Sequence, residues 1–230
     1  MAKTIIHLDG IELQENEKGP VKNLKTQLSK GFNPNKSGDT EKLHVLITYL
    51  YALEQNELLS SLLEQIYVYA QYDSNKIYLW YDYGSFLIFM ADLAESNKQK
   101  EQYLLPIAKE DIYGGDNSRI ENYYEFSGEE YQNDAVVASF ETQKFQCQYM
   151  SGHITQLLYF KHMLAKNEMK PEIEEEIELM LKNSIKYLNL FLCKKTPYKP
   201  MEFFDGLPNR IRGAGLDAVS RYMKALKHDD

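Results

Sequence analysis

The fold is decided by the stretch PEIEEEIELMLKNSIKYLNLFLC, residues 171–193, which we interpret as the second helix of a hairpin over residues 135–193. Its apolar residues recur at steps of three and four, which is the period of one buried helix face. They are Ile173, Ile177, Met180, Leu181, Ile185, Leu188, Phe191 and Leu192. Charged residues occupy the opposite face, which we expect to lie in water.

The break between the two helices is Asn167-Glu168-Met169-Lys170-Pro171. Proline suits the first position of a helix, because its missing N–H would have no partner inside the helix there. A connection of this length normally returns the second helix antiparallel to the first. The stretch therefore predicts a helical hairpin that other helices must cover.

Further helices are predicted on both sides of the hairpin. The predicted segments are 21–30, 41–55, 57–72, 77–94, 98–111 and 214–227, with Thr40 as the N-cap of the second and Pro106 bending the fifth. The segment 77–94 is apolar nearly all round, which is typical of a helix that others surround. We found no 34-residue repeat. The sequence predicts an all-α fold, either an irregular bundle or a superhelical stack of antiparallel helix pairs.

We expect one helical domain over residues 1–230. Residues 1–20 either form a short β-hairpin around Asp9-Gly10, a dipeptide typical of tight turns, or are a loosely attached tail. Two irregular stretches follow, at 112–134 and 194–213, where glycine, asparagine and proline replace the helical pattern. Long connections in compact domains are often functional, so these two stretches are the first places to look for a site.

Charge and cysteine content exclude several classes of protein. The formal net charge is −8, with 34 acidic against 26 basic residues. A protein that binds the phosphate backbone of nucleic acid needs clustered Lys and Arg, so we expect no direct nucleic-acid partner. The N-terminal apolar run is too short for a secretory signal, and no stretch predicts a membrane span. Cys147 and Cys193 lie within apolar helical patterns without C-x-x-C spacing, which favours a cytoplasmic protein.

No catalytic, metal or cofactor motif is present. His153 and His162 are nine residues apart, which places them on different faces of a helix rather than at the i, i+4 spacing of a helical metal site. No G-x-S-x-G occurs. Arg210 and Arg212, close to the predicted last helix, form a weak candidate anion site at a helix N-terminus. We therefore expect a protein that is not an enzyme and holds no metal or cofactor.

The strongest candidate site is the stretch 112–134, which combines carboxylates with tyrosines against one basic residue, Arg119. Carboxylates attract a basic partner over long range, and aromatic side chains supply buried anchors. The predicted partner-binding residues are Tyr113, Asp116, Glu121, Tyr123, Tyr124, Glu125, Glu129, Glu130 and Tyr131. Two other interpretations stay open: the tyrosines pack back onto the helices, or the stretch pairs with the basic residues of 194–212.

With its acidic helical frame and the motifs Tyr123-Tyr124-Glu125-Phe126 and Glu129-Glu130-Tyr131, the chain resembles the helical immunity proteins of bacterial polymorphic toxin systems. The resemblance implies a stoichiometric inhibitor that covers the active site of a toxin, often the basic surface of a nuclease. It implies that carboxylates take the place of nucleic-acid phosphates while tyrosines fill apolar pockets.

Two further functions remain as alternatives. One is a helical scaffold that holds a peptide or a partner helix in a groove between stacked helix pairs. The other is an enzyme or small-molecule binder with a pocket inside the bundle, which would have convergent polar side chains in a deep cavity. The residues expected to line such a pocket are Tyr78, Trp80, Tyr81, His153 and Arg210.

Overall fold

The computed structural model describes residues 37–70, 76–109, 143–193 and 209–228. This part of the chain contains seven helices and no strand, which confirms the predicted all-α class. They are α2 (Ser37–Ala52), α3 (Asn56–Ala70), α4 (Lys76–Leu93), α5 (Asn97–Lys109), α8 (Gln143–Ala165), α9 (Pro171–Cys193) and α10 (Asn209–His228). The predicted N-terminal hairpin, the helix at 21–30 and the stretch 112–134 lie outside the described residues.

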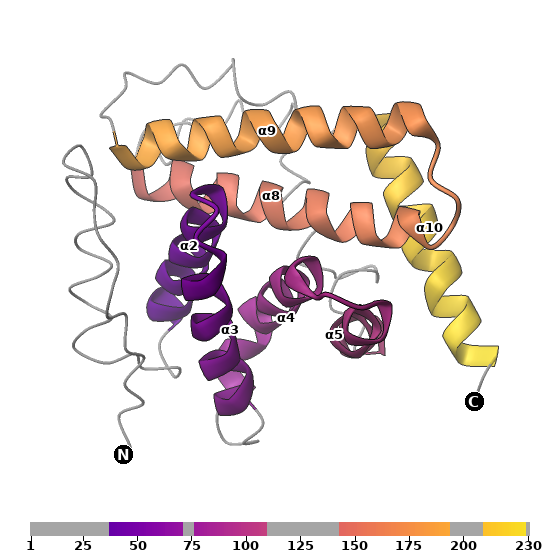
Figure 1. Cartoon of the computed structure of the whole chain (residues 1–230), viewed down its shortest axis with the longest axis horizontal. Helices are drawn as coiled ribbons and strands as arrows, with labels where there is room; N and C mark the ends of the chain where they lie inside the picture. Colours follow the sequence, from indigo (N-terminus) through magenta and orange to yellow (C-terminus); the bar gives the residue numbers. More distant parts are fainter. Residues whose placement is uncertain (1–36, 71–75, 110–142, 194–208, 229–230) are drawn as a thin grey trace, which may run out of the picture.

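The predicted hairpin of α8 and α9 is present, and the two helices lie side by side and antiparallel (Figure 1). At its turn the Asn167 side chain donates a hydrogen bond to the Met163 carbonyl at 2.8 Å, and the Asn167 N–H donates to the Leu164 carbonyl at 2.9 Å. Glu168 follows in the left-handed region with φ 55°. Pro171 is the first residue of α9, as its missing N–H predicts.

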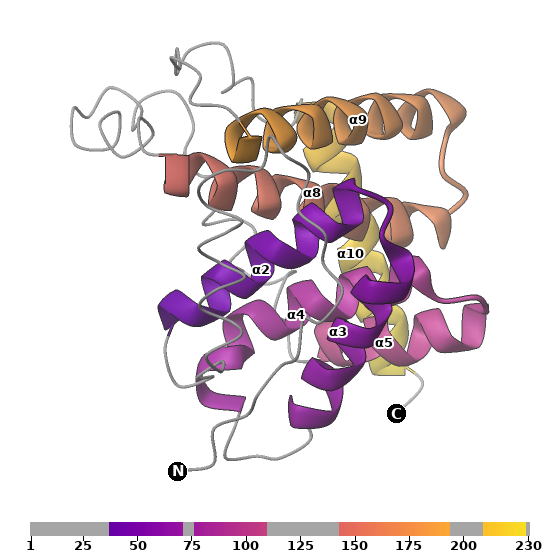
Figure 2. The same ribbon diagram turned by 60° about the vertical axis from the view of Figure 1, so that its left-hand side comes forward.

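Helix α8 is the centre of the bundle. It contacts α9 on one side and α2 and α4 on the other (Figure 2), and it contacts α10 where that helix crosses the end of the hairpin (Figure 1). All side chains from Met150 to Phe160 are consequently buried, polar ones included. The buried His44 of α2 and Thr155 of α8 share a hydrogen bond of 2.8 Å. This bond pairs two polar side chains that the contact between α2 and α8 removes from water.

Two helix starts differ from the sequence-based prediction. Helix α2 begins at Ser37, so Thr40 lies inside the helix rather than at its N-cap. Helix α10 begins at Asn209, five residues before the predicted start, because Gly213 and Gly215 were interpreted as the end of an irregular stretch. Burial of Ile211 and close packing of Gly215 on Phe160 favour helix there despite the low helix propensity of glycine.

Helix α2 ends in a left-handed residue that is not glycine. Glu54 has φ 56°, its N–H donates to the Tyr51 carbonyl at 3.0 Å, and the Gln55 N–H donates to the Leu50 carbonyl at 3.1 Å. These two bonds are the Schellman arrangement, in which glycine is the usual left-handed residue. A side chain with a Cβ is strained in this conformation.

Replacing Glu54 with glycine is therefore expected to raise the free energy of unfolding by about 0.5–1 kcal/mol, since relief of strain exceeds the added entropy of the unfolded chain. Urea denaturation followed by circular dichroism measures the change. The control is Glu57→Gly, inside the first turn of α3, which is expected to lower stability by about 0.5–1 kcal/mol. Equal destabilisation by both substitutions would contradict the prediction.

Candidate functional site

The structure leaves the main predicted site untested. The predicted partner-binding residues, from Tyr113 to Tyr131, all lie outside the described residues, so their role stays a prediction. Of the predicted anion-binding pair, Arg210 is exposed and forms an ion pair with Glu176 of α9, while Arg212 is half-buried. The carboxylate of Glu176 offsets the charge that Arg210 would present to an anion.

The residues predicted to line an enzyme pocket lie in different environments. His153 is buried within α8, whereas Arg210 is exposed at the start of α10. Burial lowers the pKa of His153 to about 4, because the charged imidazolium loses its hydration inside the bundle. The side chains of Tyr78, Trp80 and Tyr81 lie outside the described residues, although their backbone belongs to α4.

Helix α9 presents four carboxylates to solvent in its first eight residues. This helix forms an outer layer of the bundle and packs its inner residues on α8 (Figure 1). Its exposed carboxylates are Glu172, Glu174, Glu175 and Glu178, and Leu179 is exposed on the same helix. Leu179 is 59% exposed, one of the two large apolar residues that the described part leaves in solvent.

We name Glu172, Glu174, Glu175 and Leu179 the α9 patch. Glu178, beside it, is neutralised by Lys161 of α8 at 2.5 Å, and Glu176 is neutralised by Arg210. The three carboxylates of the patch form no ion pair with any described residue. Their position in the first turns of α9 also complements the positive end of the helix dipole.

A second polar group joins three helices inside the bundle. Asp92 of α4 lies 3.3 Å from Nε2 of His162 in α8, and its carboxylate also accepts a hydrogen bond from Tyr51 of α2. Burial alone would raise the pKa of Asp92, but the hydrogen bond and charge of His162, with Lys161 nearby, hold it below its usual value. The pKa of Tyr51 rises through burial and through the neighbouring carboxylate.

An aspartate that orients a histidine is one half of a general-base arrangement in enzymes, and it is also how packed helices bury polar groups together. Sequence analysis missed both residues. The available signal was weak: Asp92 is one of two aspartates in the apolar segment 77–94, the other being Asp82, and His162 was weighed only as a metal ligand. In the described residues no group of three or more His, Cys, Asp or Glu is placed to hold a metal ion.

A third group fixes α10 to the rest of the bundle. Glu101 of α5 accepts hydrogen bonds from the Lys166 ammonium, just after α8, and from the Tyr222 hydroxyl of α10. The Lys166 Nζ also lies 4.8 Å from the centre of the Tyr222 ring. Burial alone would raise the pKa of Glu101, but the hydrogen bonds from Lys166 and Tyr222 outweigh burial and lower this pKa. The pKa of Tyr222 is raised by burial and by its hydrogen bond to the Glu101 carboxylate. We interpret this group as one that holds α5, α8 and α10 together, since the Lys166 ammonium and the Tyr222 hydroxyl both already donate to Glu101.

The fold and the α9 patch define an all-α bundle whose outer helix carries exposed carboxylates and an exposed leucine. Comparison of the chain with protein-family models, with curated proteins and with solved structures found no match. Of the helices in the described ranges, none is both long enough and apolar enough to cross a membrane.

Proposed function

We propose that this chain is a non-catalytic protein-binding protein, an immunity-type inhibitor that binds a basic and nuclease-like toxin domain in stoichiometric amount. The observation that carries the proposal is the α9 patch. It places three exposed carboxylates, without ion pairs in the described part, on the same helix as an exposed leucine. A protein–protein interface pairs such charges with opposite charges of the partner, and it covers exposed apolar surface.

The proposed mechanism divides the work between charge and apolar contact. Carboxylates attract a basic surface and raise the rate of encounter, and they occupy the positions that nucleic-acid phosphates would take on a nuclease. Leu179 is the described residue suited to be buried at the centre of the contact. Residues 112–134 contain the same combination of carboxylates with large apolar side chains, here tyrosines. We propose that they form the second half of the same interface.

The test begins with a pull-down from lysate of the source organism, with the full tagged chain as bait. The expected result is one stoichiometric partner of net positive charge that is released at high salt. Expressed alone, that partner is expected to arrest growth, and co-expression of this chain is expected to restore it. A neutral partner, binding that salt does not weaken, or a co-purifying small molecule without a protein would contradict the proposal.

Two variants then locate the interface. Neutralising the patch with Glu172→Gln, Glu174→Gln and Glu175→Gln is expected to lower the association rate about tenfold at low salt, since these charges steer the encounter. Reversing the charge of Glu125, Glu129 and Glu130 is expected to abolish binding. The matched control is Lys182→Gln with Lys186→Gln, on exposed positions of the same helix, which is expected to leave the rate equal or higher. Unchanged binding in both acidic variants would refute the proposed mechanism.

A further inference from the structure

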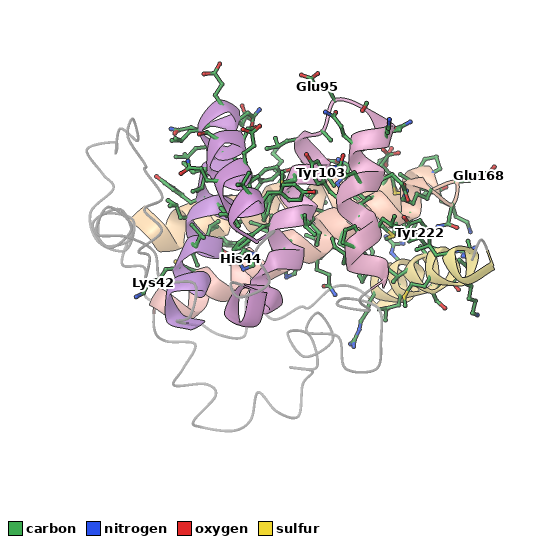
Figure 3. The ribbon with its side chains drawn as sticks, turned by 90° about the horizontal axis from the view of Figure 1, so that it is seen from below. Lys42, His44, Glu95, Tyr103, Glu168 and Tyr222 are labelled. Atoms are coloured by element: carbon green, nitrogen blue, oxygen red, sulfur yellow. The ribbon has the colours of Figure 1, made fainter. Side chains whose placement is uncertain are left out.

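A pocket of about 190 Å³ lies where α3, α4 and α5 meet. None of its lining residues belongs to α9. Figure 3 shows Glu95 at the turn between α4 and α5, and Tyr103 deeper beside α3. The lining residues are Ser60, Leu63, Glu64, Met90, Leu93, Ala94, Glu95, Gln99 and Tyr103. They combine an apolar floor with an acidic rim.

The corner that carries the rim is held by local hydrogen bonds. Ser96 Oγ accepts the Gln99 N–H at 3.3 Å, which caps the start of α5, and donates to Gln99 Oε1 at 3.1 Å. The Ser96 carbonyl also accepts the Lys100 N–H at 3.0 Å. Glu95 precedes this cap directly, so the position of its backbone is set before any ligand arrives.

The floor and the rim differ sharply in exposure. Leu63 and Met90 are buried, whereas Glu64 and Glu95 are exposed. Neither carboxylate forms an ion pair with a residue that the structure describes. Glu64 nevertheless lies close to the half-buried Tyr103. The pKa of the Tyr103 phenol is raised, mainly by burial and further by Tyr67 and by the negative charge of Glu64.

The ring of Tyr103 completes the pocket. It packs edge-on against Tyr67 of α3, with ring centroids 5.7 Å apart and planes at 85°. This contact fixes the orientation of an aromatic ring beside two carboxylates. Aromatic faces and carboxylates both favour a cation, and an apolar floor favours a hydrocarbon chain.

From this geometry we propose that the pocket receives one arginine or lysine side chain of a protein partner. The volume is below the roughly 300 Å³ at which small-molecule sites begin, so it suits a single side chain rather than a cofactor. The aliphatic stem lies on Leu63 and Met90, and the charged end meets Glu64 and Glu95. The inference rests on the proposed function for the source of the side chain, because an inhibitor of a basic domain meets many such side chains.

The test uses small probes rather than the unidentified partner. Butylguanidinium, butylammonium and the peptide acetyl-Gly-Arg-Gly-amide are titrated into the ¹⁵N-labelled full chain and followed by NMR, with neutral butyramide as the comparison. The cations and the peptide are expected to shift the amide signals of α3, the α4–α5 turn and Tyr103, with millimolar affinity. Butyramide is expected to bind at least about tenfold more weakly, because it lacks the charge.

The variant Glu64→Gln with Glu95→Gln is expected to lose about tenfold in affinity for the cations, and its spectrum reports whether it is folded. The control Glu57→Gln lies on the same helix outside the pocket and is expected to bind normally. Equal binding of butyramide, no shift at the pocket, or exclusion of the peptide would overturn the proposal. The probes do not depend on the partner, so failure here and failure of the pull-down remain separate results.

Discussion

Replacing Gly215 with alanine is expected to lower the free energy of unfolding by about 2–3 kcal/mol, because the added methyl group has no room. A Cβ at this position would lie 2.4–2.6 Å from three carbons of the Phe160 ring. Phe160 is fully buried in α8, so its ring cannot move aside without disturbing the centre of the bundle. The cost exceeds the gain of up to about 1 kcal/mol in helix propensity.

The chain offers a matched control two residues away. A Cβ at Gly213, which is exposed in the same helix, would meet nothing within 4 Å. Gly213→Ala is therefore expected to raise stability by about 0.5–1 kcal/mol, through helix propensity alone. Chemical denaturation of both variants measures the difference. If Gly215→Ala were as stable as Gly213→Ala, α10 would not pack on Phe160 as described.

Lowering the pH from 6.5 to 4 is expected to remove about 3 kcal/mol of stability through His153 alone, since each pH unit between its two pKa values contributes about 1.4 kcal/mol. The unfolded chain takes up the proton near the ordinary value of 6.5, whereas burial lowers the folded-state pKa to about 4. Between these values the unfolded state binds more protons, so the stability decreases as the pH falls. Below the lower value both states are protonated and the loss from this residue stops.

Urea denaturation at intervals between pH 7 and pH 4.5 measures the effect, with His153→Gln as the comparison because glutamine does not titrate. The difference in stability between the two proteins is expected to change steadily over this range. Asp92 and Glu101 have lowered pKa values, so they add stability above their unfolded-state pKa values of 3.8 and 4.5 and lose it only at lower pH. A difference independent of pH would show that His153 is not buried as neutral imidazole.

Most helices of the described part could be predicted because helix formation depends on residues three and four apart. The periods in 41–55, 57–72 and 171–193, and the long apolar run 77–94, placed α2, α3, α9 and α4 to within a few residues. The start of α10 could not be predicted, since two glycines argue against helix locally and the packing that favours helix comes from α8. The predicted site at 112–134 lies outside the described residues and stays a prediction.

The groups that connect helices had almost no signal in the sequence. Asp92 and His162 are 70 residues apart in the chain, and Glu101 and Tyr222 are 121 residues apart, so these pairs exist only because α4 packs on α8 and α5 packs on α10. The floor and the rim of the α3–α5 pocket are likewise set by packing angles between helices. Such angles depend on the fit of whole faces rather than on any one residue.

The sequence by itself determined the helical class, the hairpin and its turn at Asn167–Pro171, and the acidic outer face of α9, because hydrogen bonds and amphipathic period act within a few residues. Only the tertiary structure decided that α8 is buried on every side from Met150 to Phe160, that Gly215 must lack a side chain, and which carboxylates are neutralised. The physical reason is that burial, close approach and ion pairing depend on neighbours distant in the chain, whose positions follow from packing of the whole bundle.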